Sequence, residues 1–131
     1  MLMGEKHRMD IIEARKDLGV VIVRMAAQRR TQEEIEELGA LLANLKYAEP
    51  DYFLEFDIAF HLKLADMAKN STLKEILSSI LLHTRVNQAD DGGKQISSLD
   101  YDAIYNAIAE GNQEAAAQAM ETLIKDEMEV Y

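Results

Sequence analysis

Residues 50–70 read PDYFLEFDIAFHLKLADMAKN, and they are the most informative stretch of this chain. Large apolar side chains recur there at intervals of three and four residues, the spacing of one helix face: Tyr52, Phe53, Phe56, Phe60, Leu64 and Met67. Pro50 suits the first turn of a helix because the N–H that proline lacks is not needed there. Asn70 suits a C-terminal cap. The stretch therefore predicts an amphipathic helix whose aromatic stripe faces a core.

The segments before and after this stretch have the same periodicity. From about Glu5 to Arg29 apolar residues occupy two faces of a helix, so we expect one face to pack inside the domain and the other against a partner. Thr31-Gln32-Glu33-Glu34 fits a capping box that opens a helix ending near Lys46.

The second half of the chain predicts three more helices. Thr72-Leu73-Lys74-Glu75 fits another capping box, which opens a helix running to about Arg85. Residues 87–97 lack periodicity and read as an exposed loop. A fifth helix is expected from about Ser98 to Glu110, and Asn112 can cap a sixth.

The composition agrees with an all-α protein. The 131 residues are the size of one domain, and they include one proline, six glycines and no cysteine. No segment reads as a strand pair, and no apolar run approaches the roughly 20 residues of a membrane helix. We therefore predict one domain over 1–131, an antiparallel bundle of about six helices, with no membrane contact and a cytoplasmic location.

The charge distribution argues against direct DNA binding. The net charge is −10; residues 1–30 carry +3, so the rest carry −13. A duplex DNA binder needs a cationic face, and this body would repel phosphates. Any nucleic-acid function would need another domain. The simpler interpretation is that the acidic charge keeps the protein in solution.

Asp57 and His61 are the first candidates for a binding site. They are four residues apart, so both lie on one helix face, and the same stripe carries Phe53, Phe56 and Phe60. Such a pair can bind one metal ion or hold one polar ligand. A buried polar pair needs partners, which a ligand or water in a cavity would supply. The alternative is a pair that only stabilises the helix.

Further candidates carry simpler alternatives of their own. Arg15, Arg24 and Arg85 lie beside apolar stripes, where an arginine often anchors a carboxylate but usually lies along the surface. His83 is more often a packing residue than a ligand. Tyr101 and Tyr105 are four apart and can place two hydroxyls in a cavity, or simply pack. No Glu-x-x-His pair, phosphate loop or nucleophile elbow is present, so we expect no enzymatic activity.

The ordered set of motifs resembles a known family. Phe56-Asp57-Ile58-Ala59-Phe60-His61, followed by Asn70, is similar to the Asp-x-x-Phe-His…Asn signature of the FadR-type C-terminal (FCD) domain. That domain binds effectors and forms dimers in many GntR-family bacterial transcription regulators. Other matching pieces run from about residue 10 to 128: Glu13-Ala14-Arg15 with Ala26-Ala27, Thr31–Ile35, Asn70–Leu73, Arg85, Tyr101–Ile108 and Gly111–Ala116 with Met120.

The resemblance implies a helical bundle with a central cavity for a small effector, often an organic acid. In many members an aspartate and three histidines hold a divalent metal there. Asp57 and His61 match two ligands, but Tyr101 and Leu123 stand at the other two positions. We therefore expect no cofactor, and at most weak Zn, Ni or Mn binding. The glutamate that often follows the first-helix arginine by four residues is Gly19 here.

Together these observations predict the effector-sensing, dimer-forming domain of a GntR-type regulator. Arg15 and Arg85 are expected to bind a carboxylate of an organic acid. The other polar groups of the acid are assigned to four side chains: Asp57, His61, Tyr101 and Tyr105. A homodimer is expected, with DNA contacted only through a separate winged helix-turn-helix domain, whose absence here predicts an excised domain or a stand-alone sensor. The alternatives are a ligand-free interaction or scaffold domain, and a metal-dependent sensor using Asp57 and His61.

Overall fold

Six α-helices and one 3₁₀ turn make up the described part of the chain. The computed structural model describes the backbone of residues 2–88 and 98–130 and the side chains within 4–83 and 98–127. The elements are α1 (Leu2–Arg29), α2 (Gln32–Lys46), η1 (Pro50–Tyr52), α3 (Phe53–Met67), α4 (Ser71–Gln88), α5 (Ser98–Glu110) and α6 (Gln113–Val130). None of the described residues forms a strand, so the predicted all-α bundle is confirmed. Of the predicted loop, residues 89–97 lie outside the described residues.

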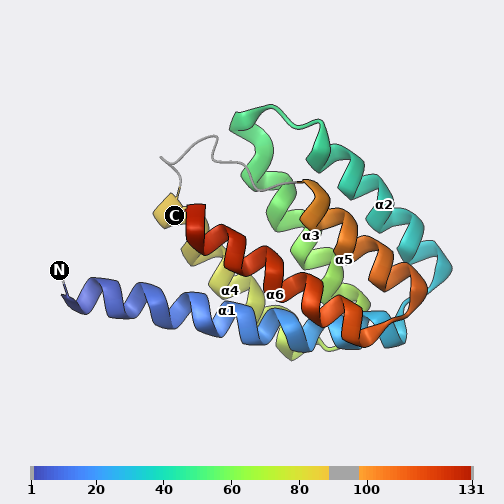
Figure 1. The fold of residues 1–131 in the computed structure, drawn as a ribbon, viewed down its shortest axis with the longest axis horizontal. Helices are drawn as coiled ribbons and strands as arrows, with labels where there is room; N and C mark the ends of the chain where they lie inside the picture. Colours follow the sequence, from blue (N-terminus) through green and yellow to red (C-terminus); the bar gives the residue numbers. More distant parts are fainter. Residues whose placement is uncertain (1, 89–97, 131) are drawn as a thin grey trace.

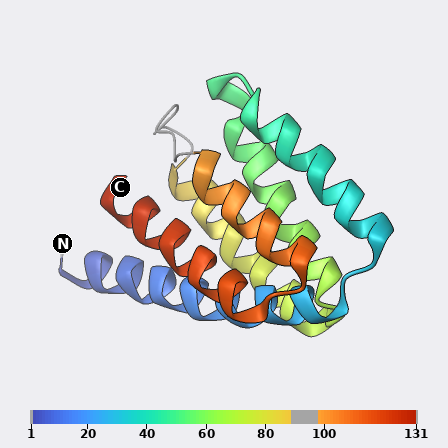
Figure 2. The ribbon, with the colours of Figure 1, turned by 45° about the vertical axis from the view of Figure 1, so that its right-hand side comes forward.

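The helices are layered around α3, which packs against α1, α2 and α4 (Figure 1). α6 lies between α1 and α5, and α5 also contacts α2 (Figure 2). The N-terminal half of α1 extends beyond the body of the bundle, as both views show. Side chains from α1, α3, α5 and α6 can therefore meet in the interior.

Two of the predicted helix starts are confirmed in atomic detail. Thr31 Oγ1 accepts a hydrogen bond from the backbone N–H of Glu34, and Glu34 Oε1 accepts one from the N–H of Thr31. This reciprocal pair is the capping box that the sequence predicts. Asn112 Oδ1 accepts from the N–H of Ala115 at the start of α6. Gly111 has φ +71°, a left-handed conformation that suits glycine and lets the chain reverse between α5 and α6.

The predicted boundary between the third and fourth helices is wrong. Asn70 does not cap the end of α3: its Oδ1 accepts from the N–H of Leu73, so it opens α4. α4 begins at Ser71, and the capping box predicted at Thr72 is therefore wrong as well. The left-handed Lys69 (φ 60°) turns the chain after α3. Asparagine is the stronger N-cap residue, and here it lies two positions before the threonine.

A close antiparallel contact between α1 and α6 sets the geometry of the interior. A Cβ on Gly19 would lie 3.2 Å from Met120 Cγ, so the absence of a side chain at Gly19 allows this approach. On one side of this contact Arg24 binds Glu114, and on the other Arg15 meets Glu127. The buried alanines Ala26, Ala27 and Ala116 are consistent with the same close approach. Across the described residues, no helix is both long and apolar enough to cross a membrane.

Candidate functional site: a buried polar cluster on four helices

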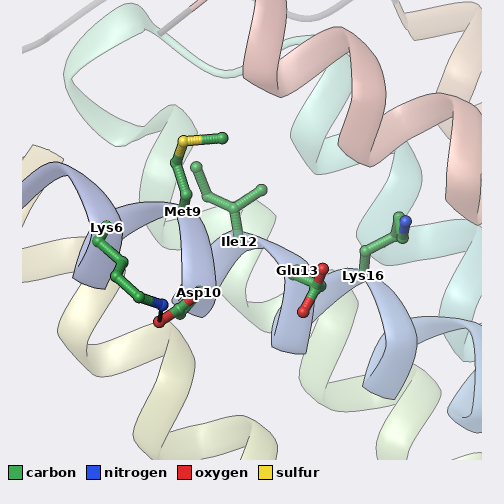
Figure 3. A pocket seen from close by; sticks show the side chains of 6 residues that line it. All are labelled: Lys6, Met9, Asp10, Ile12, Glu13 and Lys16. Carbon is green, nitrogen blue, oxygen red and sulfur yellow. Dashed lines mark hydrogen bonds and ion pairs between the residues drawn. The ribbon is translucent and has the colours of Figure 1, made fainter.

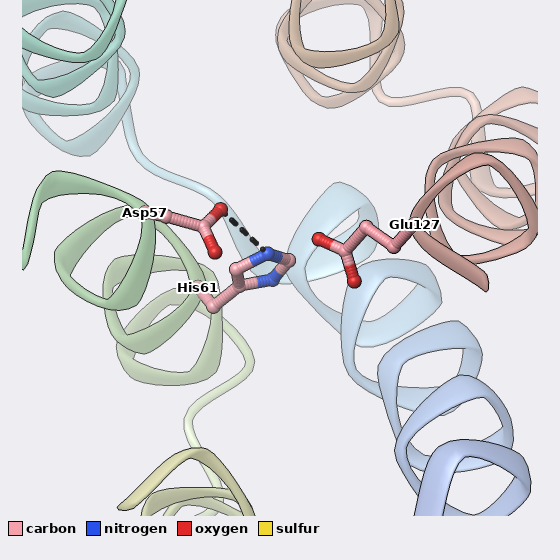
Figure 4. Close-up of side chains that lie close together, drawn as sticks. All are labelled: Asp57, His61 and Glu127. Atoms are coloured by element: carbon pink, nitrogen blue, oxygen red, sulfur yellow. Dashed lines mark ion pairs between the residues drawn. The ribbon is translucent and has the colours of Figure 1, made fainter. Parts of the chain in front are cut away.

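Five polar side chains meet in the interior of the bundle. They are Arg15 from α1, Asp57 and His61 from α3, Tyr101 from α5 and Glu127 from α6. All five are buried, and the most exposed of them, Arg15, has 8% of its surface accessible. Figure 4 shows three of them: the carboxylates of Asp57 and Glu127 point toward one another, and the ring of His61 lies between them. We call this group the polar cluster.

The α3 pair is held from both sides by aromatic groups. Asp57 Oδ1 lies 3.3 Å from His61 Nε2 and accepts a hydrogen bond of 2.8 Å from the Tyr101 hydroxyl. The ring of Phe60 meets Tyr101 edge-to-face at 5.5 Å and His61 at 6.0 Å. The i,i+4 spacing places Asp57 and His61 on one inward face, as the sequence predicts, because Phe60 lies on the same buried stripe.

The charge of Arg15 is balanced by carboxylates from two helices. Arg15 Nη1 lies 2.6 Å from Glu127 Oε2, and Nη2 donates to Glu127 Oε1 at 3.2 Å. Nη2 also lies 3.4 Å from His61 Nε2, so this nitrogen either accepts from Arg15 or donates to Asp57, depending on the tautomer. Arg15 Nε and Glu127 Oε2 are buried without a hydrogen-bond partner among the described residues. The cluster is therefore incompletely satisfied.

The pKa values of the two carboxylates in the polar cluster are shifted in opposite directions. Burial opposes the ionisation of Asp57, but the charges of His61 and Arg15 and the hydrogen bonds from His61 and Tyr101 together hold its pKa below the ordinary value. Burial raises the pKa of Glu127, and the charge of Arg15 only partly offsets this. The interior thus favours the charged form of Asp57, whereas it stabilises the charged form of Glu127 less well.

Other candidates lie away from the cluster. Tyr105 is half-buried, and its hydroxyl is the nearest atom that a Cβ on Gly39 of α2 would meet. Arg24 forms a surface ion pair with Glu114, and His83 is exposed with its ring against His7. Arg85 lies in α4, but its side chain is outside the described residues. The structure thus brings together Arg15, Asp57, His61 and Tyr101 of the candidates.

Glu127 was missing from the sequence-based candidates. It follows Met120, Leu123 and Ile124 at helical spacing, so a charged residue occupies a position of the apolar stripe. That is the signal that would have found it. Leu123, which the family resemblance places at a ligand position, is fully buried in the core, and Glu127 follows it by one turn on the same face.

A metal ion does not fit the cluster in this arrangement. Asp57, His61 and Glu127 offer three ligand atoms within 4.8 Å of one another, and carboxylate and imidazole are suitable donors. However, the Arg15 guanidinium lies against both Glu127 and His61. A cation could bind all three donors only if that buried positive charge moved away.

One surface hollow lined by described residues lies elsewhere. It has a volume of about 420 Å³ and follows the N-terminal half of α1 (Figure 3). Its lining residues are Lys6, Met9, Asp10, Ile12, Glu13 and Lys16, and none of them belongs to the polar cluster. In the cluster itself the five side chains contact one another, so a ligand there would have to replace some of these contacts.

An acidic pair lies next to the cluster and makes stability depend on pH. Burial, the Asp126 carboxyl and the charge of Glu127 raise the pKa of Asp100 from 3.8 to about 6. A raised folded-state pKa gives a stabilising contribution that is complete below pH about 4 and is lost as the pH rises through 6. At neutral pH this contribution is gone and the repulsion between Asp100 and Asp126 remains.

Asp126→Asn is therefore expected to stabilise the protein at pH 7.5 and to have little effect at pH 4. We expect a gain of about 1 kcal/mol, less than the shift alone would give because solvent screens partly exposed charges. Thermal melts of both proteins from pH 4 to 8 measure the difference. A gap that stayed constant over this range would contradict the assignment.

The chain is thus an all-helical bundle with a buried arginine–carboxylate–histidine cluster in its interior. The model of the FCD domain family matches residues 10–126, and the chain belongs to this family. The resemblance to the FadR-type C-terminal domain of GntR-family regulators is thus confirmed. The HTH-type transcriptional regulator LutR of Bacillus subtilis (strain 168) is 32% identical over 145 aligned residues. The alignment covers 100% of this chain and 66% of LutR.

Proposed function

We propose that this chain is the effector-sensing domain of a GntR-type transcription regulator and that it binds a small organic acid at the polar cluster. The observation that carries the proposal is a buried arginine that faces a carboxylate with both terminal nitrogens. Arg15 is the kind of group that binds a carboxylate bidentately. Membership of the FCD family supports the regulatory role.

Each member of the cluster has a separate part in binding. Arg15 takes the carboxylate of the effector, with Arg85 of α4 as a second cation. Asp57 accepts a hydrogen bond from a hydroxyl of the effector, and His61 donates to its second polar group. The Tyr101 hydroxyl keeps its hydrogen bond to Asp57 and can accept one from the effector. Tyr105, which lies against Gly39, has no part in this arrangement.

Binding is transmitted because the cluster joins four helices. A ligand that favours one arrangement of α1 against α3 and α6 shifts the population toward it. α1 is the first helix of the domain, so its movement changes the spacing of a preceding winged helix-turn-helix domain, which makes the DNA contacts in the cytoplasm. The acidic body leaves DNA binding to that separate domain.

A homodimer fits the apolar surface of α1 and α4. These helices pack against each other and expose large apolar side chains, namely Val21 on α1 and Ile76 and Leu82 on α4. Leu82 is 62% exposed. Light scattering coupled to size exclusion measures the mass in solution, and a monomer at all concentrations would contradict the dimer.

Two alternatives remain distinguishable from effector binding. In a scaffold domain the same cluster only fixes how the helices pack, and no acid binds. In a metal-dependent sensor Asp57, His61 and Glu127 hold the ion, which requires Arg15 to move. Elemental analysis of the purified protein separates the second: stoichiometric zinc, nickel or manganese would favour the metal sensor.

The test of acid binding is calorimetry with acetate, glycolate, succinate, malate and citrate on the wild type and on Arg15→Gln. We expect at least one acid to bind the wild type and to bind Arg15→Gln at least about 100-fold more weakly, since a charged hydrogen-bond partner is lost. Arg24→Gln, which changes a surface arginine on the same helix, is the matched control. If no acid bound, or if Arg15→Gln bound as tightly as the wild type, the proposal would fail.

A further inference from the structure

Glu127 holds Arg15 in the manner expected of an external carboxylate. Its two oxygens lie against the two terminal nitrogens of the guanidinium, at 2.6 Å and 3.2 Å. This end-on arrangement, with one carboxylate oxygen against each terminal nitrogen, is one in which the guanidinium fork can hold the carboxylate of a bound acid. The carboxylate comes from α6, 112 positions away in the sequence, and it occupies a stripe position where the neighbours Met120, Leu123 and Ile124 are apolar.

The contact between Arg15 and Glu127 is buried but imperfect. Arg15 Nε and Glu127 Oε2 have no hydrogen-bond partner among the described residues, although Oε2 is close enough to Arg15 for an ion pair. Burial also raises the pKa of Glu127, which shows that its charged form is the less well accommodated of the two carboxylates. A buried ion pair with unsatisfied atoms gains little over its desolvation cost. Glu127 is therefore a replaceable partner of Arg15.

Glu127 is held by fewer side chains than Asp57. Among the described residues, the contacts of its carboxylate are with one side chain, that of Arg15. Asp57, by contrast, lies within α3 and is held by both His61 and Tyr101. Release of Glu127 therefore breaks contacts with one side chain, whereas release of Asp57 breaks contacts with two.

We propose that Glu127 is an internal competitor of the effector: its carboxylate occupies the face of Arg15 that the effector's carboxylate takes, and binding displaces it. This inference rests on the proposed function, in which the effector is an organic acid bound at Arg15. Competition by Glu127 lowers the apparent affinity of the protein for the effector, because only the fraction of molecules with a free guanidinium binds it. An acid with a second polar group, which reaches Asp57 or Tyr101, overcomes this loss better than a simple monocarboxylate. Release of Glu127 removes one of the contacts that join α6 to α1, which links occupancy to the helix that leads to the DNA-binding domain.

The experiment replaces the competitor by a free carboxylate. Glu127→Ala keeps Cβ and removes Cγ and the carboxylate of the side chain. Acetate consists of one methyl carbon and a carboxylate, so it can fill the space of the removed atoms. Thermal melts are recorded with increasing acetate for the wild type, Glu127→Ala and Glu121→Ala, the last an exposed glutamate of the same helix. Acetamide, which has the same shape but no charge, is the control ligand. Glu127→Gln is the milder second variant, and calorimetry gives its affinity for the five acids.

We expect acetate to raise the melting midpoint of Glu127→Ala by about 5 °C at saturating concentration, and to have little effect on the wild type or Glu121→Ala. Acetamide should not raise the melting midpoint of Glu127→Ala. Glu127→Gln should bind the acids about 10-fold more tightly than the wild type. If the wild type binds an acid and Glu127→Gln binds it no more tightly, the competitor role is overturned and the proposed function stands. If no acid binds any of the proteins, the proposed function itself fails.

Discussion

Arg15→Met is expected to destabilise the protein by about 3–5 kcal/mol at pH 7.5, because it leaves a buried carboxylate without its cation. Arg15 is 8% exposed and Glu127 is 6% exposed, so water cannot replace the lost partner. Asp57 loses a nearby positive charge at the same time. Urea denaturation followed by circular dichroism measures the change in the free energy of unfolding.

A double variant separates the ion pair from the rest of the site. Glu127→Leu removes the second charge with a side chain that suits the neighbouring stripe of Met120, Leu123 and Ile124. Replacing both members of a buried pair by apolar residues is often neutral, whereas removing one is costly. We therefore expect Arg15→Met/Glu127→Leu to be more stable than Arg15→Met alone. Strictly additive losses would show that the two residues are not coupled.

Phe60→Ala is expected to cost about 3–5 kcal/mol, the second large effect. Phe60 is 0% exposed and lies at the centre of the core, where its ring contacts Tyr101 and His61 edge-to-face. Its loss leaves a cavity beside the polar cluster and frees both rings. The same urea titration measures the effect.

Tyr47→Ala provides the control for a large aromatic side chain without burial. Tyr47 is 87% exposed, so its replacement should change the stability by less than about 0.5 kcal/mol. Acid binding should weaken in Phe60→Ala, because Tyr101 and His61 lose the ring that orients them. A loss below about 1 kcal/mol in Phe60→Ala would mean that this ring does not support the core.

The fold could be predicted from the sequence because local signals and the apolar pattern agree. The capping box at Thr31 and the Gly111–Asn112 turn use hydrogen bonds within three residues, and such contacts are visible in sequence. The error at Asn70 arose where two capping residues compete within three positions. Asn70 is the residue that caps α4, because the left-handed Lys69 turns the chain just before it.

Only part of the candidate site could be predicted. Asp57 and His61 share a helix face with Phe60, so spacing alone indicated that they point inward. Glu127 was missed because its partner, Arg15, lies at the other end of the chain, and no local pattern joins the two. The role of Tyr105 stays a prediction: it lies one turn from Tyr101, but its hydroxyl is next to Gly39 of α2 and not in the polar cluster.

A crystal structure of the protein with the tightest-binding acid of the panel tests the central claim most directly. The account predicts a carboxylate of that acid within about 3 Å of the terminal nitrogens of Arg15, with Glu127 turned away from the guanidinium and Asp57 still hydrogen-bonded to Tyr101. An acid bound in the hollow along α1, or anywhere else with the Arg15–Glu127 pair unbroken, would contradict it.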